Sequence, residues 1–177
     1  MATIYCSNKL KDFIGIDYFI TSETTKPCLF GDWNVHLFYF DRRKFLICVN
    51  NKSYYCLILD SIKKSDFKRF ANIFIDRLIS QLLIDKIINP FEVPNVTSKL
   101  IPFSFSKTNN DRKTISTMNE FIYMYKVCRT TDSWPYKSLE EINSTLNDTL
   151  TGAGRNHERD YGRPIEDMRM LIKNTCA

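Results

Sequence analysis

The chain has 177 residues, of which 44% are hydrophobic and 25% charged, and its formal net charge is +5. These values are typical of one globular domain with a sizeable core, and they exclude a collagen-like or disordered chain. The glycines form neither a GxGxxG nor a Walker-type loop, which argues against a nucleotide-cradling fold. Charged side chains interrupt the longest apolar segment, and the N-terminus lacks a signal-peptide pattern. The sequence therefore predicts a single cytoplasmic domain over residues 1–177, without membrane contact.

The first expected elements are a short strand at residues 3–6 and a small helix that ends at Ile14. Ser7 is suited to the N-cap of this helix, because its hydroxyl can accept from a free backbone N–H of the first turn. Gly15 stands where a left-handed C-terminal cap is favoured.

Three apolar runs predict the centre of the fold. Residues 33–40, 45–49 and 54–59 are rich in aromatic and β-branched side chains, and short polar turns at 41–43 and 50–53 separate them. Turns of this length are too short for a crossover helix. The pattern therefore predicts an antiparallel β-meander over about 32–60.

The cysteines contain no CxxC pair, which argues against a zinc site. A two-residue turn after Cys48 would place Cys48 and Cys56 on opposite faces of the sheet, where they cannot form a disulfide. We expect free thiols in a reducing compartment, with no metal and no cofactor. The cysteines are Cys6, Cys28, Cys48, Cys56, Cys128 and Cys176.

Apolar residues at three- and four-residue spacing predict amphipathic helices over about 65–88 and 112–129, which would cover the sheet. Asn89-Pro90 is expected to end the first helix, because proline disfavours helix in the preceding residue. Residues 99–105 between the helices fit an edge strand, where Pro102 would be tolerated.

Two shorter helices are expected near the C-terminus. Ser138 and Glu141 form a capping box at the start of one, and Pro164 suits the first position of the other. Together the elements predict an α+β fold: the antiparallel meander at about 32–60, the two long covering helices, and these two shorter helices.

Two stretches resemble a bacterial family of small proteins known as a domain of unknown function. They are GDWNVHLFYFDRRKFLICVN and DRKTISTMNEFIYMYK. The shared pattern is a Trp strand, an Asp-Arg-Arg turn, a strand that ends in Val-Asn, and a downstream Arg followed by Met-Asn on a helix. In this chain these residues are Trp33, Asp41-Arg42-Arg43, Val49-Asn50, Arg112 and Met118-Asn119. The resemblance extends from Met1 to about Lys126 and implies a bacterial, intracellular, single-domain protein, without implying a catalytic residue.

Two basic clusters are candidates for a nucleic-acid-binding surface. In a meander, the first hairpin tip lies near the end of the third strand, so both clusters are expected at one edge of the molecule. Tyr39 and Phe40 beside them would add aromatic stacking to phosphate contacts. The alternative is that these charges only solubilise a hairpin and a helix end. The clusters are Arg42, Arg43 and Lys44, and Lys63, Lys64, Lys68 and Arg69.

A polar loop near the C-terminus supports a different hypothesis. Arg155, His157, Glu158 and Arg159 could provide the general base, the orienting carboxylate and the phosphate clamp of a metal-independent nuclease or other hydrolase. The alternative is a solvated loop with weak surface ion pairs. The other histidine, His36, lies within a predicted strand, on the face opposite Trp33, and is expected to be a core or half-exposed histidine rather than a ligand or base.

These features lead to three hypotheses. The first is a small binding protein for nucleic acid or a partner protein, in a mobile-element, toxin–antitoxin or defence context. The second is the hydrolase that uses the 155–160 loop. The third is a structural protein whose exposed aromatic residues, such as Tyr54 or Trp134, form an interface with a partner.

Overall fold

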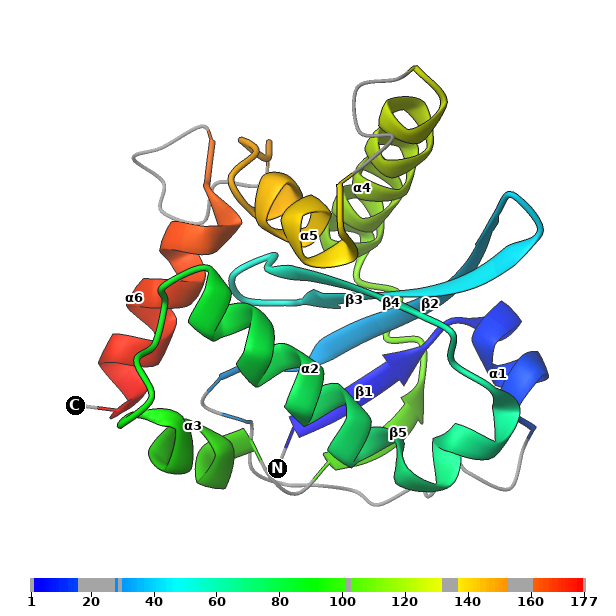
Figure 1. The fold of residues 1–177 in the computed structure, drawn as a ribbon. Helices are drawn as coiled ribbons and strands as arrows, with labels where there is room; N and C mark the ends of the chain where they lie inside the picture. The colour runs from blue at the N-terminus through cyan, green and yellow to red at the C-terminus, as the bar shows by residue number, and fades with distance from the viewer. Residues whose placement is uncertain are drawn as a thin grey trace.

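The computed structural model describes residues 2–15, 28, 30–100, 103–131, 137–152 and 161–176. The described residues form a mixed five-stranded sheet in the order β4-β3-β2-β1-β5 (Figure 1). Strands β2, β3 and β4 are the predicted antiparallel meander, whereas β1 is parallel to both of its neighbours, β2 and β5. The strands are β1 (Ala2–Cys6), β2 (Trp33–Phe40), β3 (Arg43–Asn50), β4 (Cys56–Asp60) and β5 (Phe103–Lys107).

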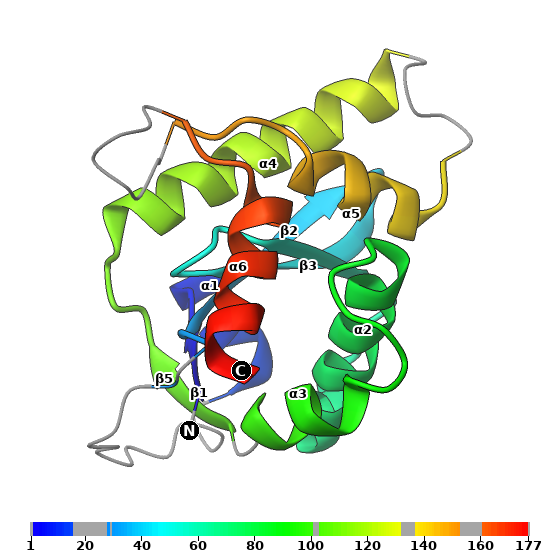
Figure 2. The ribbon, with the colours of Figure 1, turned by 90° about the vertical axis from the view of Figure 1, so that its left-hand side faces the viewer.

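Helices pack on both faces of this sheet (Figures 1 and 2). Alternation along the strands gives each face its own apolar set, because successive side chains point to opposite sides. One core joins the sheet to α1, α2, α3 and α6, and the other joins it to α4 and α5. The helices are α1 (Asn8–Ile14), 3₁₀ helix η2 (Lys64–Arg69), α2 (Phe70–Ile84), α3 (Val93–Leu100), α4 (Arg112–Thr130), α5 (Leu139–Asn147) and α6 (Pro164–Cys176).

The structure confirms the α+β class and most of the predicted helix ends. The Ser7 hydroxyl accepts from the backbone N–H of Leu10 at 3.3 Å, and Gly15 has a φ of 102°. The capping box of Ser138 and Glu141 is present at the start of α5. In the described part of the chain, no helix has both the length and the apolar character needed to cross a membrane.

The helix predicted over 65–88 is divided and shorter. Its first residues form η2, and α2 ends at Ile84, so Asn89-Pro90 does not end it. Lys86, with a φ of 54°, turns the chain, and the N–H of Ile87 donates to the carbonyl of Leu82 at 2.9 Å. This is the hydrogen-bond pattern of a Schellman cap, here without the usual glycine.

The region predicted as a strand over 99–105 contains the end of a helix and the start of β5. Residues 93–100 form α3, and the edge strand covers 103–107. Val96 and Leu100, four residues apart, are buried against the core, so an amphipathic turn prevails over the local prolines. Pro94 is tolerated because it lies in the first helical turn.

The predicted geometry of the cysteines is confirmed. Cys48 is paired with Leu57 and Cys56 with Val49, so the two cysteines point to opposite faces of the sheet. Each belongs to a different hydrophobic core. All six cysteines of the chain are free thiols.

Candidate functional site

A groove of about 570 Å³ lies between the β2–β3 hairpin tip, the end of β4, the end of α1 and the start of η2. It brings together two basic segments that are distant in the sequence. The described residues that line it carry five basic side chains and one carboxylate, that of Asp60. The basic residues are Arg42, Arg43, Lys44, Lys63 and Lys64.

The sheet register explains this convergence. Phe40 is paired with Arg43, so Asp41 and Arg42 form a two-residue turn at the hairpin tip. Phe45 is paired with Asp60, which places the end of β4 beside the start of β3. The chain then turns towards η2 and carries Lys63 and Lys64 to the same edge, as the sequence predicted.

Three of the six described non-glycine residues with a positive φ lie at or beside the groove. Asp41 and Arg42 have φ values of 46° and 59°, and Ser61, in the groove wall, has a φ of 58°. A left-handed conformation costs a non-glycine residue about 1 kcal/mol or more. Strained residues of this kind tend to occur at ligand-binding sites.

The aromatic side chains in the groove differ from the predicted ones. Phe13 and Phe45 line it, and Lys44 Nζ lies 4.5 Å from the centre of the Phe13 ring. Tyr39 lies outside the lining, with Lys9 Nζ 4.5 Å from its ring centre. Phe40 packs against Tyr125, with 5.6 Å between the ring centres. Sequence reasoning missed Phe13 because only the tertiary fold brings α1 beside the hairpin.

Lys68 and Arg69 do not line the groove, although the sequence grouped them with it. Both lie in η2 and are exposed to solvent. The guanidinium of Arg69 lies 3.8 Å from the carboxylate of Asp66. Five of the seven predicted basic residues are therefore brought together around one groove.

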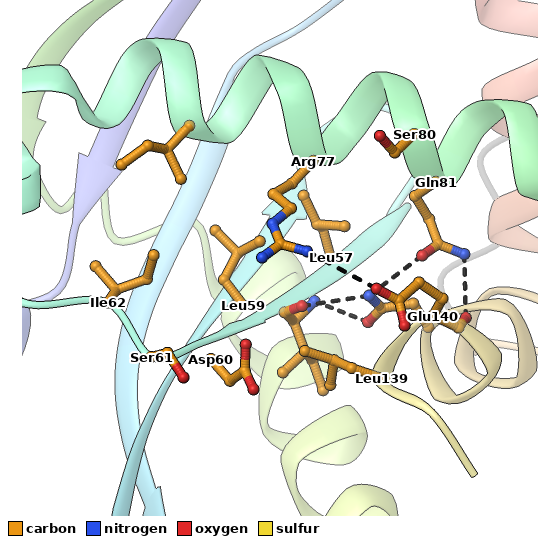
Figure 3. A pocket seen from close by; sticks show the side chains of 13 residues that line it. Leu57, Leu59, Asp60, Ser61, Ile62, Arg77, Ser80, Gln81, Leu139 and Glu140 are labelled. Carbon is orange, nitrogen blue, oxygen red and sulfur yellow. Dashed lines mark hydrogen bonds and ion pairs between the residues drawn. The ribbon is translucent and has the colours of Figure 1, made fainter.

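A smaller pocket of about 140 Å³ adjoins the groove, between β4, α2 and α5 (Figure 3). Residues 60–62 line both cavities. Leu57, Leu59, Ile73 and Leu139 give the pocket apolar walls. The two cavities are thus neighbours that share one wall. The groove is basic, and the pocket is largely apolar.

Side-chain amides lie along the edge of β4, and two of them, those of Asn143 and Gln81, line the pocket. Asn143 Oδ1 accepts from the N–H of Ile58 at 2.8 Å, and Asn143 Nδ2 donates to the carbonyl of Ile58 at 3.2 Å. Asn147 makes the same pair of bonds with Cys56, at 2.7 and 2.9 Å. Gln81 Nε2 donates to Ser144 Oγ at 3.0 Å. Side chains of helix α5 therefore form the hydrogen bonds with the backbone groups at the edge of β4 that a further strand would form.

Two side chains of opposite charge lie at the rim of the pocket. The Arg77 guanidinium and the Glu140 carboxylate are 3.8 Å apart, and their side chains are 57% and 44% exposed (Figure 3). This distance is longer than an ordinary hydrogen bond, and the pair is open to water, so it is a weak interaction.

Residues 3–167 match the family described as a domain of unknown function (DUF6933). The chain belongs to this family. No curated protein and no solved structure matches the chain. The DUF6933 match includes every residue of the groove and of the pocket, but the family description states no activity.

The hydrolase candidates of this DUF6933 chain, Arg155, His157, Glu158 and Arg159, lie outside the described residues. His36 is described and half-buried, on the face of β2 opposite Trp33. Its pKa is lowered by burial and, to a lesser extent, by Lys9 and Lys126. Within the described ranges, no group of three His, Cys, Asp or Glu side chains could hold a metal ion.

The third hypothesis required exposed aromatic residues. Tyr54 is only 4% exposed and belongs to the core beneath α4 and α5, so the expectation of an interface there is wrong. Its burial follows from its place just before β4, where the chain turns back under those helices. Trp134, the other candidate, lies outside the described residues.

Proposed function

We propose that this protein binds nucleic acid and that the groove contacts the sugar–phosphate backbone. The observation that carries this proposal is the convergence of five basic residues, from two separate segments, around one groove. Phosphate contacts by Lys and Arg supply most of the sequence-independent affinity for nucleic acids. A single carboxylate among the described lining residues leaves the groove with an excess of positive charge.

The shape of the surface favours binding over simple solubilisation. Charges that only solubilise a protein need no shared cavity, whereas these side chains line a concave surface with Phe13 and Phe45. A two-residue hairpin turn itself requires a positive φ at both central residues. Arginine in place of glycine at position 42, and the left-handed Ser61, nevertheless add a conformational cost that solubility does not require. Arginine at the tip also suits planar, bidentate contact with phosphate oxygens.

The proposal includes a biological setting. We place the protein in the bacterial cytoplasm, in a mobile-element, toxin–antitoxin or defence context. This setting rests on the small size of the chain, its basic clusters and the resemblance of its motifs to an uncharacterised bacterial family. Identification of the genes that flank the coding sequence would test it, and a neighbourhood of ordinary housekeeping genes would contradict it.

The direct test is binding to labelled single- and double-stranded RNA and DNA at about 50 and 200 mM salt. We expect affinity to fall by roughly tenfold or more between these salt concentrations, because phosphate contacts release counterions. The double variant Arg43→Ala/Lys63→Ala should weaken binding. The control variant Arg112→Ala/Lys113→Ala removes the same charge from the exposed start of α4 and should leave the affinity for nucleic acid unchanged.

Two outcomes would favour the other hypotheses. Cleavage of the labelled strands that is lost in His157→Ala would support the hydrolase that uses Arg155, His157, Glu158 and Arg159. An absence of binding at low salt, together with co-purification of another chain from the native host, would support a protein partner.

A further inference from the structure

We infer that the pocket beside the groove receives one unstacked pyrimidine base of a single strand whose phosphates lie in the groove. This inference rests on the proposed function and names the class of nucleic acid that the site takes. It is carried by three properties of the pocket: its adjacency to the groove, its size, and the chemistry of its walls and rim.

The two cavities are adjacent because they meet at the end of β4 and the two residues after it. Asp60, Ser61 and Ile62 line both cavities, so a ligand that passes over this shared wall can reach both. Figure 3 shows Asp60 and Ser61 on one side of the pocket and Arg77 and Glu140 on another. In a nucleotide, the base and the phosphate are joined through one sugar. Adjacent apolar and basic cavities match that arrangement.

The size of the pocket selects the type of base. Its volume is about 140 Å³, and an apolar cavity of about 150 Å³ is known to bind benzene. The pocket therefore has room for one six-membered ring. A pyrimidine matches this volume more closely than the larger fused rings of a purine do, so a pyrimidine is the base that we assign to the pocket.

The walls are suited to the faces of a base. Ile62, Ile73 and Leu139 are partly exposed and present apolar surface to the pocket, which favours a flat ring that has left its stack. The pocket is also held in shape without a ligand, because Asn143 is already bonded to both backbone groups of Ile58. A preformed cavity avoids the cost of ordering side chains when the ligand binds.

The rim is suited to the edge of a base. The Arg77 guanidinium can donate to a ring carbonyl, and the Glu140 carboxylate can accept from an amino or imino group. Their mutual contact of 3.8 Å is weak enough to be exchanged for such bonds. In a strand, the backbone N–H and C=O groups of every second residue point to the same side. The backbone groups of Asp60 therefore face the same outer edge of β4 as those of Ile58, which are bonded to Asn143. They add a donor and an acceptor at the pocket.

A duplex keeps its bases stacked and paired, so its bases cannot enter the pocket without being flipped out. The inference therefore predicts that single strands bind more tightly than duplexes of the same length, in addition to any attraction between phosphates and the groove.

The test compares the binding of short labelled oligothymidylate, oligodeoxyadenylate, an abasic strand of equal length, and heparin. The wild-type protein should bind oligothymidylate roughly tenfold more tightly than the abasic strand, because one base is buried. Ser80→Trp places a large ring at the exposed α2 position that lines the pocket, and it should remove this preference. Ser116→Trp adds the same ring to the exposed surface of α4 and should retain it. Neither variant should change the affinity for heparin.

The outcomes separate this inference from the proposed function. Equal wild-type affinity for oligothymidylate and the abasic strand would overturn the base pocket while leaving phosphate binding in place, and this comparison needs no variant to fold. A thymidine preference that persists in a folded Ser80→Trp protein would likewise overturn it. Binding to none of the strands and not to heparin, even at low salt, would refute the proposed function and the base pocket together.

Discussion

The side chain of Asn143 is paired with the backbone of Ile58 as a neighbouring β-strand would be. Its amide accepts from the N–H and donates to the carbonyl of the same residue. Edge strands that lack such a partner expose backbone groups that can pair with other chains. Asn147 repeats the arrangement one helical turn later, at Cys56. Helix α5 thus satisfies the buried part of the β4 edge through two side chains at helical spacing.

This pairing predicts a large effect for Asn143→Ala. The substitution leaves the buried N–H and carbonyl of Ile58 without a partner, and each unsatisfied group costs about 1–3 kcal/mol. We expect the free energy of unfolding to fall by about 2–4 kcal/mol in urea titrations. Asn119→Ala, on the exposed surface of α4, should change it by about 0.5 kcal/mol or less. Equal effects of the two substitutions would contradict this role for Asn143.

A second prediction concerns the core beneath α2. Phe74 is fully buried, and its ring makes edge-to-face contacts with Trp33 at 5.0 Å and with Phe103 at 5.5 Å between ring centres. Phe74→Ala should lower the free energy of unfolding by about 3–5 kcal/mol, because it removes these contacts and leaves a cavity. Phe91→Ala makes the same change at a side chain that is 94% exposed. It should have little effect in the same thermal or urea unfolding experiment.

The meander could be predicted because its signal is local. Two-residue alternation and short polar turns fix β2, β3 and β4, and the same geometry predicts that Arg42 and Lys63 share an edge. The parallel pairing of β1 with β5 has no such signal, since it joins Ile4 to Phe105 across most of the chain. Helix α3 was missed because the prolines of this region, Pro90, Pro94 and Pro102, and its short length outweighed the spacing of its buried residues.

The pocket could not be predicted from local patterns either. Its inner wall depends on Asn143 meeting Ile58, 85 residues away in the sequence. Asparagine within a helix usually faces solvent, so nothing in the α5 sequence indicates that its amides replace a strand. Only the position of α5 at the open edge of the sheet gives these side chains their role.

The buried thiols predict how stability depends on pH. Burial raises the pKa of Cys6 to about 12 from the ordinary value of 9.0. The folded state therefore retains this proton where the unfolded chain loses it. The stabilisation is complete below about pH 9 and is lost as the pH rises from there towards 12. Burial also raises the pKa of Cys48 and of Cys56, so the decline in stability should be steep.

Urea titrations between about pH 7 and 11 would measure this decline. Cys6→Ala should reduce the slope above about pH 9 by up to about 1.4 kcal/mol per pH unit, the contribution of one proton. Any loss of packing in the variant shifts stability equally at every pH, so the pH 7 value serves as the internal control. An unchanged slope would show that the Cys6 thiol does not contribute to the pH dependence.

The strained hairpin tip predicts that stability and binding respond in opposite directions. Arg42 adopts a left-handed conformation directly after Asp41, the position where two-residue hairpins favour an Asp-Gly turn. Arg42→Gly should therefore raise the free energy of unfolding by about 1 kcal/mol. It also removes a groove cation, so it should lower nucleic-acid affinity and reduce the slope of log affinity against log salt by about 1.

Arg43→Gly is the matched control for this prediction. It removes the same charge from the same groove, but at the first residue of β3, where glycine weakens a strand by about 0.5–1 kcal/mol. Both variants should therefore bind nucleic acid more weakly, while urea titrations should show one stabilised and the other destabilised. If the Arg42→Gly protein is also less stable than the wild type, arginine does not strain the hairpin tip. If the Arg42→Gly protein is more stable but binds nucleic acid as tightly as the wild type, the strained conformation of Arg42 contributes nothing to binding. The strain would then serve something other than phosphate contact.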